Sequence, residues 1–237
     1  MSYVMGFVAA VPTANKEAYR RFAQESVDYF KSLGVKRMVE TWGDDVPRGE
    51  TTDFHRAVDA REGEEIVYSF QIFPDKATAD AANEKMMNDP AMQDMGAKMP
   101  FDGARMIFGG FETLSDLQSE GQSAYIDGSV TAVPTASKSA YAQGIDNYFE
   151  LFKEHGAVRM VEAWGDFVPE GKLTDFKRAV AAKPDETVVF SWIEWPSKEV
   201  RDRAWQAVYA DPRMQQGGAE YDESRRIYGG FVPIIDA

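Results

Sequence analysis

The 237-residue chain contains no cysteine and only two histidines, His55 and His155. Without cysteine there is neither a disulfide framework nor thiolate chemistry, which suits a reducing compartment, so we expect a cytoplasmic protein. Neither histidine recurs at the equivalent position of the internal repeat described below. A histidine-held haem or zinc ion is therefore not supported. No spacing of carboxylates matches a dedicated cation site, and we expect no metal and no cofactor.

Long apolar runs and net positive charge are also lacking. No run approaches the roughly 20 apolar residues that cross a bilayer. No basic segment followed by an apolar stretch precedes the first predicted strand, so no secretory signal is expected. The formal net charge of −13 disfavours nucleic acid and anionic membranes as partners, because both repel an acidic protein. With 44% hydrophobic and 27% charged residues, the composition is that of a soluble globular protein.

The chain contains an internal sequence repeat. Residues 37–44 (RMVETWGD) return 122 positions later as residues 159–166 (RMVEAWGD), and after a two-residue deletion the offset becomes 120. A period this long indicates a duplicated domain, because solenoid repeats span only about 20–50 residues. Each half has an ordinary domain size. We place the first repeat at residues 1–114 and the second at 124–237, joined by the polar segment Ser115–Ser123.

Both repeats predict the same order of elements. In the first repeat we expect strands at 3–11, 35–43, 65–73 and 105–111, and helices before Gly34 and at 75–88; in the second, strands at 125–133, 157–165, 187–195 and 225–231, and helices before Gly156 and at 197–210. Asp89 and Asp211, each followed by proline, indicate a further short helix. The segments that begin at Asp53 and Asp175 fit a short helix or a strand.

This β-α-β-β-α-β order is that of ferredoxin-like units. Helices would cover one face of each sheet, yet the strands are apolar on both faces. The second face therefore needs a cover, and the other repeat can supply it. We predict an α+β fold in which two ferredoxin-like units pack sheet to sheet as an intramolecular pseudo-dimer.

Four sequence motifs, taken together, form a specific signature. They are RMVExWGDxVP and TDFxRAV, which occur with small variations in both repeats, FSWIEWPSK at 190–198 and MPFDGxRMI at 99–107. The chain resembles, over the whole of each repeat, the YbaA-like family of uncharacterised bacterial proteins. The resemblance implies single-domain relatives of about half this length and the dimeric α+β-barrel superfamily. That superfamily includes monooxygenases, isomerases, haem enzymes and ligand-sensing domains, so the fold does not fix a function.

Two carboxylates in the second strands are the candidate catalytic residues, Glu40 and Glu162. Strand alternation puts each on the face opposite its small apolar neighbours Val39 and Val161. Such small residues suit packing against helices, so we expect both carboxylates to face the barrel interior. There each needs a polar partner, such as arginine, tyrosine or a backbone amide. A carboxylate beside Trp164 could act as a general acid or base; the alternative is a structural carboxylate at the seam between repeats.

The repeats differ in a patterned way that favours a polar pocket in the second. Met5 and Phe7 become Asp127 and Ser129, and Ile72 becomes Glu194. The predicted ligand-binding residues are Asp127, Ser129, Trp164, Trp192, Glu194 and Arg225. Arg225 recurs as Arg105 in the first repeat; such an arginine can bind an anion through a bidentate fork or pair with a carboxylate of the protein.

Two functions remain open from the residues. One is a protein that binds a small organic molecule in the barrel interior, with acid–base or cofactor-free oxidative chemistry at Glu162. The other is a non-enzymatic structural or interaction module without a ligand site. A cavity of roughly 300 Å³ or more lined by Trp164, Trp192 and Glu162 would favour the first, and a filled interior would favour the second.

Overall fold

Eight strands close a single barrel to which both repeats contribute. The computed structural model describes residues 1–215 and 221–237. The first repeat supplies β1 (Tyr3–Pro12), β2 (Arg37–Asp45), β3 (Glu64–Phe73) and β4 (Ile107–Gln118), and the second supplies β5 (Tyr125–Pro134), β6 (Arg159–Phe167), β7 (Glu186–Trp195) and β8 (Ile227–Asp236). Their order around the barrel is β1-β3-β2-β8-β5-β7-β6-β4. The predicted α+β fold, with two units sharing one barrel inside one chain, is confirmed.

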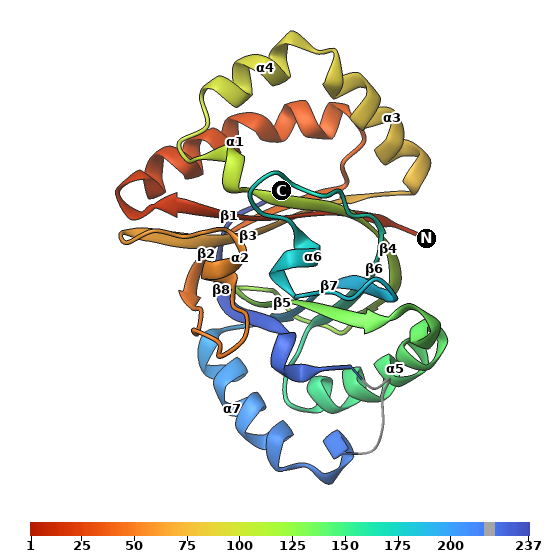
Figure 1. The fold of residues 1–237 in the computed structure, drawn as a ribbon. Helices are drawn as coiled ribbons and strands as arrows, with labels where there is room; N and C mark the ends of the chain where they lie inside the picture. The colour runs from red at the N-terminus through yellow and green to blue at the C-terminus, as the bar shows by residue number, and fades with distance from the viewer. Residues whose placement is uncertain (216–220) are drawn as a thin grey trace.

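Helices cover the barrel on two opposite sides (Figure 1). The strands of the first repeat carry α1 (Lys16–Ser32), α3 (Lys76–Met87) and α4 (Pro90–Ala97), and those of the second carry α5 (Lys138–Glu154) and α7 (Lys198–Ala210). Asp89 caps α4 by accepting the backbone N–H of Ala91 at 2.9 Å, as the Asp-Pro sequence predicts. After Asp211, residues Pro212–Gln215 form a 3-10 turn; the rest of the predicted short helix lies outside the described residues.

The segments after Asp53 and Asp175 are short helices, α2 (Phe54–Ala57) and α6 (Phe176–Ala179). Asp53 begins α2 by accepting the N–H of Arg56 at 2.8 Å, and Asp175 does the same for Arg178. The two helices contact each other. They deliver Phe54 and Phe176 into the barrel core.

The repeats are joined along two seams, β2 with β8 and β4 with β6. The prediction that residues Ser115–Ser123 form a polar linker is wrong for the first four of them, and the second seam explains why. β4 runs on to Gln118, because its final residues pair with β6 as far as Gln118 opposite Arg159. The partner strand comes from the other repeat, so the polar composition of β4 alone gives no sign of this pairing.

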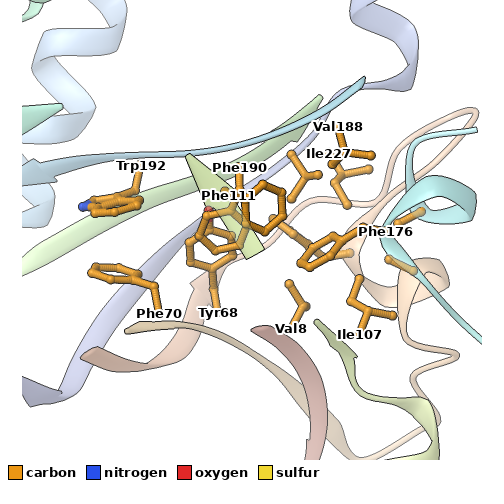
Figure 2. Packing of buried hydrophobic residues seen from close by; sticks show 14 of the residues in the cluster. Val8, Tyr68, Phe70, Ile107, Phe111, Phe176, Val188, Phe190, Trp192 and Ile227 are labelled. Atoms are coloured by element: carbon orange, nitrogen blue, oxygen red, sulfur yellow. The ribbon is translucent and has the colours of Figure 1, made fainter. Parts of the chain in front are cut away.

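Aromatic side chains fill the barrel interior. Tyr68 stacks on Phe190 with ring centroids 4.4 Å apart, and Phe70 stacks on Trp192 at 4.0 Å. Figure 2 shows these rings meeting from opposite sides of the barrel. The prediction of a ligand site between the sheets is therefore wrong, because packed side chains occupy that space.

The small residues of the strands face this crowded interior and not the helices. Val39 and Val161 belong to the barrel core. A Cβ atom at Gly6 would lie 2.7 Å from the Phe190 ring, and one at Gly128 would lie 2.8 Å from the Tyr68 ring. Small side chains are thus needed where the large rings meet. The assignment of strand faces is reversed, and Glu40 and Glu162 point outward to the helices.

Candidate functional site

Glu162 lies on the outer face of β6, beneath α5. The Tyr141 hydroxyl of α5 donates to its Oε2 at 2.8 Å, and the Ser191 hydroxyl of β7 donates to the same oxygen at 2.5 Å. The predicted polar partner, a tyrosine, is confirmed. Burial raises the pKa of Glu162, and the two hydrogen bonds and the nearby Arg226 oppose this only in part.

The first repeat contains the same arrangement. Tyr19 of α1 and Ser69 of β3 donate their hydroxyls to Oε2 of Glu40, the latter at 2.5 Å. Burial likewise raises the pKa of Glu40. It also raises the pKa of Tyr19 and Tyr141 well above the ordinary tyrosine value, so both phenols remain neutral donors. We call these two sets of residues the first and second Glu–Tyr–Ser clusters.

A pocket opens beside the second cluster, between the sheet and the helices α5 and α7. It consists of two adjoining spaces of about 250 and 510 Å³ that share one wall. The shared wall is formed by Ser129, Glu162, Ser191, Ile193, Trp205, Glu223 and Arg226. Tyr141, Phe152 and Tyr221 close the smaller space under α5. We call the two spaces together the second-repeat pocket, and Glu162 stands where they meet.

Arg226 supplies positive charge in this pocket. Its Nη2 donates to the Ser129 hydroxyl at 3.4 Å, and its Nη1 lies 3.8 Å from a carboxylate oxygen of Glu223. The guanidinium lies close enough to Glu162 to favour the carboxylate form. The equivalent position in the first repeat is Met106, so this charge is particular to the second repeat.

Asp127 was predicted to bind a ligand, and it lines the larger space of the pocket. Both of its carboxylate oxygens, however, already accept hydrogen bonds from other residues. Oδ1 accepts Nε of Arg201 at 2.8 Å, and Oδ2 accepts the indole N–H groups of Trp195 and Trp205 at 2.9 and 2.7 Å. The carboxylate thus anchors α7 on the sheet and holds Trp205 in the pocket wall. Ser129, which lines both spaces, keeps its hydroxyl toward Arg226.

Glu194 does not converge with Glu162, and the prediction that the two share a site is wrong. β7 alternation turns Glu194 to the barrel side, where it is 3% exposed. It receives Nη1 and Nη2 of Arg37 at 2.6 and 2.9 Å and the indole N–H of Trp192 at 3.0 Å. The Trp192 indole itself stacks on Phe70 in the core, while the residue also lines the larger space of the second-repeat pocket. These residues form a closed hydrogen-bonding network across the seam. Such a network is what the hypothesis of a structural module without a ligand site predicts for the carboxylates.

Trp164 and Arg225 also lie elsewhere than predicted. Trp164 packs with Val133 and Val189 beneath the Lys138 ammonium, and it is not among the described residues that line the pocket. Arg225 forms a bidentate pair with Glu186, with both N–O distances 2.7 Å. Arg105 pairs with Glu64 in the same way in the first repeat. The arginine that recurs at these two positions thus serves the shared fold.

The sequence reasoning missed four residues of the pocket: Tyr141, Trp205, Tyr221 and Arg226. Three of them differ from the equivalent residues of the first repeat, and this difference could have indicated a specialised role. Trp205, Tyr221 and Arg226 correspond to Asn83, Phe101 and Met106. Tyr141 recurs as Tyr19, and it is recognisable only when helix and strand are seen together.

No group of three or more histidine, aspartate or glutamate residues suited to a metal ion occurs among residues 1–215 and 221–237.

In the described part of the chain, none of the helices has the length and apolar character needed to cross a membrane.

Two comparisons identify relatives of each repeat. The profile of the family described as "Protein of unknown function (DUF1428)" matches residues 2–103 and again residues 124–223. "Uncharacterized protein YbaA" of Escherichia coli K12 is 53% identical over 116 residues, which are 99% of YbaA and 49% of this chain. The protein of the same name from Shigella flexneri gives the same values.

Solved structures resemble the whole chain in fold. A proposed monooxygenase of Fusobacterium nucleatum superimposes with a TM-score of 0.60 at 12% identity, covering 99% of this chain and 93% of its own. Another from Lactobacillus acidophilus gives 0.56 at 11% identity, with coverages of 100% and 96%. At such identities the likeness concerns the architecture of the barrel, and the chemistry must be argued from the site.

Proposed function

This chain belongs to the DUF1428 family of proteins of unknown function and carries the family's domain twice, and from the geometry above we propose that its second repeat binds a small planar organic molecule and transfers a proton to or from it at Glu162. The observation that carries the proposal is the carboxyl group itself. It is partly buried, its pKa is raised, and it borders a cavity that also holds a guanidinium. Perturbed carboxyl groups in clefts are typical of functional sites.

The pocket has the composition of a small-molecule site. Phe152, Ile193 and Trp205 supply apolar and aromatic walls, while Arg226 and Tyr221 supply hydrogen-bond donors. Ligand sites commonly combine such walls with a few convergent polar groups in a volume of roughly 300–1,000 Å³. Flat aromatic walls suit a planar ligand, and the Arg226 guanidinium suits a carbonyl or phenolic oxygen through charge-assisted hydrogen bonds.

The second Glu–Tyr–Ser cluster leaves one carboxyl oxygen for chemistry. Tyr141 and Ser191 both bond Oε2, and no described residue donates a hydrogen bond to Oε1. In the reaction that we propose, Oε1 takes a proton from a carbon next to the ligand's carbonyl group. The electron pair of the C–H bond forms a carbon–carbon double bond, and the π pair of the carbonyl group moves onto its oxygen, where Arg226 stabilises the developing negative charge. A raised pKa makes the carboxylate a stronger base near neutral pH.

Cofactor-free oxidation would start from the same step, because an enolate or phenolate is the electron-rich form of such a ligand. Proton transfer is therefore the activity to measure first, and it needs no added cofactor. The two hydroxyl donors fix the carboxyl group and keep Oε1 directed toward the pocket, which preorganises it for the transfer.

Deuterium exchange tests the proposal directly. Small planar ketones and phenols are first screened for thermal stabilisation of the protein, since ligands that bind the native state raise its stability. Each ketone that binds is then incubated with protein in D2O, and incorporation next to the carbonyl group is followed by NMR. We expect Glu162→Gln to abolish the exchange while binding persists. Arg226→Met should remove binding, and Glu40→Gln, the matched control, should change neither. Exchange that survives in Glu162→Gln would refute the acid–base role.

The structural module remains the second candidate, because the Glu194–Arg37 and Asp127–Arg201 networks are complete without a ligand. Stabilisation by none of the screened compounds, together with equal effects of Glu40→Gln and Glu162→Gln on stability at every pH, would favour it.

A further inference from the structure

The first repeat has a pocket of its own. A space of about 330 Å³ lies between the strands of the first repeat and the helices α1, α3 and α4. Seven of the chain's eleven methionines line it, among them Met86, Met95 and Met99. Phenylalanines complete the wall, and the first Glu–Tyr–Ser cluster forms its polar end at Glu40. We call this space the first-repeat pocket.

Its chemistry is opposite to that of the second-repeat pocket at equivalent positions. Where the second repeat has Arg226, Tyr221 and Ser129, the first has Met106, Phe101 and Phe7. The described residues that line it include no lysine, arginine or histidine. A ligand here would find an apolar surface and one carboxyl group, but no cation.

Methionine gives this wall an unusual property. Its side chain is unbranched, polarizable and flexible, so it adapts to ligands of variable shape. Helix α4, which brings Met92 and Met95 to the pocket, has no fully buried residue. The apolar side chains of this helix are thus available to cover a flexible ligand. A rigid planar molecule would gain less from such a wall than a chain that bends with it.

We propose that the first-repeat pocket binds an aliphatic chain of medium length that ends in a neutral hydroxyl group, with the hydroxyl hydrogen-bonded to Oε1 of Glu40. Tyr19 and Ser69 both bond Oε2 of this carboxyl group, and within the described residues Oε1 has no hydrogen-bond donor. A carboxylate head group would meet Glu40 without any cation to pair with. Burial, which raises the pKa of Glu40, disfavours the ionised form that an ammonium head group would need.

This proposal concerns the first repeat, whereas the proposed function concerns the second, so the two proposals are independent. Its test uses 1-decanol titrated into the full chain by calorimetry. Ala9 lines the first-repeat pocket, and its counterpart Thr131 lines the second. Ala9→Phe fills the first space, so decanol binding should weaken at least tenfold, whereas Thr131→Phe should retain it. Equal binding to both variants, or no decanol binding to the wild-type chain, would overturn the proposal.

A second pair of variants avoids reliance on a substitution that crowds the interior. Met95 lies on the loosely buried helix α4, and Met95→Lys places a charge in the pocket wall. We expect it to weaken decanol binding about tenfold, which corresponds to about 1.4 kcal/mol. Met87, on the neighbouring helix, is exposed, and Met87→Lys should bind as the wild type does. Equal affinities of Met95→Lys and Met87→Lys would contradict the site.

The head group is tested with decanoate and decylamine at about pH 6, where both head groups are charged. Both should bind at least tenfold more weakly than decanol. Decanoate that binds as tightly as decanol would show that Glu40 does not face the head group, and tighter binding of decylamine would show that the carboxyl group is ionised and pairs with a cation. Either result would overturn the assignment of a neutral hydroxyl group.

Discussion

Glu40 and Glu162 hold equivalent places in the two repeats and accept hydrogen bonds from the same pair of hydroxyl groups, yet they open onto pockets of opposite character. Around Glu162 stand a guanidinium, phenols and an indole. Around Glu40 stand thioethers and phenyl rings. The hydrogen bonds that hold each carboxyl group are thus part of the shared fold, whereas the surrounding side chains decide which ligand can reach it.

The comparison also separates residues that serve the fold from those that serve a site. Arg105 and Arg225 recur and form the same ion pairs with Glu64 and Glu186. Arg226 does not recur, and it lies in a pocket. Among these arginines, the recurring pair serves the fold, and the unmatched one beside a cavity indicates a specialised role.

The largest loss of stability is expected at Asp127, whose counterpart is Met5. Asp127→Met leaves the indole N–H groups of Trp195 and Trp205 unpaired and removes a partner of the part-buried Arg201. Breaking a buried ion pair of this kind from one side costs roughly 3 kcal/mol. Met5→Leu, which conserves volume, should cost less than about 1.5 kcal/mol. Urea unfolding measures both, and equal losses would show that the network contributes nothing beyond packing.

A smaller loss is expected at the seam between the repeats. Arg37→Ala strips Glu194 of its bidentate partner. We expect a loss of about 2 kcal/mol, below the value for a fully buried pair because the Arg37 side chain is 21% exposed. Arg159 is its counterpart, but its close partner is Asp116 and Glu194 lies 3.6 Å away.

Arg159→Ala should therefore cost less than Arg37→Ala in the same urea experiment. The double variant Arg37→Met, Glu194→Ile gives position 194 the residue that the first repeat has at Ile72. It should recover part of the lost stability, because no unpaired buried charge remains, although the Trp192 indole N–H loses its acceptor. A double variant less stable than Arg37→Ala would show that the ion pair itself stabilises the barrel.

The pH dependence of stability should distinguish the two clusters by a smaller amount. Burial raises the folded-state pKa of both glutamates above the ordinary value of 4.5. The native state then holds more protons than the unfolded state above that pH, so stability is lost as pH rises through the folded pKa. Glu40→Gln and Glu162→Gln each remove this loss and should gain stability relative to wild type as pH rises.

The gain should be larger for Glu40→Gln, by about 1 kcal/mol or less, because Arg226 favours the carboxylate form of Glu162 and the first repeat has methionine there. Thermal unfolding between pH 4 and 8 measures the difference. A larger gain for Glu162→Gln would mean that Arg226 does not act on that carboxyl group.

The smallest effects are expected where the repeats are alike. Lys76 pairs with Asp166 and Lys198 pairs with Asp44, and each aspartate also accepts a tyrosine hydroxyl from the other repeat. The side chains of the two lysines are 46% and 41% exposed, so solvent screens both pairs. Lys76→Ala and Lys198→Ala should each cost less than about 1 kcal/mol, and their melting temperatures should agree. Unequal values would indicate that the asymmetry extends beyond the pockets.

Most of the fold could be predicted from the sequence, because element order and the duplication leave few ways to cover two-sided apolar strands. The parity of Glu40 and Glu162 along their strands was also predictable. Which face of each strand meets the helices was not predictable, since valines such as Val39 and Val161 can pack either against helices or in the barrel interior. The answer depends on the interior rings of Tyr68 and Phe190, which require Gly6 and Gly128 opposite them.

The pocket was harder to predict than the fold for a related reason. Its residues come from helices α5 and α7, from strands β5, β6 and β7 and from the segment before β8, so no single segment displays them together. Glu194 differs from Ile72 and so resembles a site residue in sequence, but its partner Arg37 lies in the other repeat. Contacts across a seam are invisible to any pattern read within one repeat.

The two seams that join the repeats bear on how such a protein can evolve. A chain with one repeat could close this barrel only with a second copy of itself, and symmetry would then impose every substitution on both sites at once. Here β2–β8 and β4–β6 join two covalently linked halves that differ in sequence. Each half can accumulate its own changes while the other keeps the barrel closed, and assembly no longer depends on protein concentration because the halves meet within one molecule.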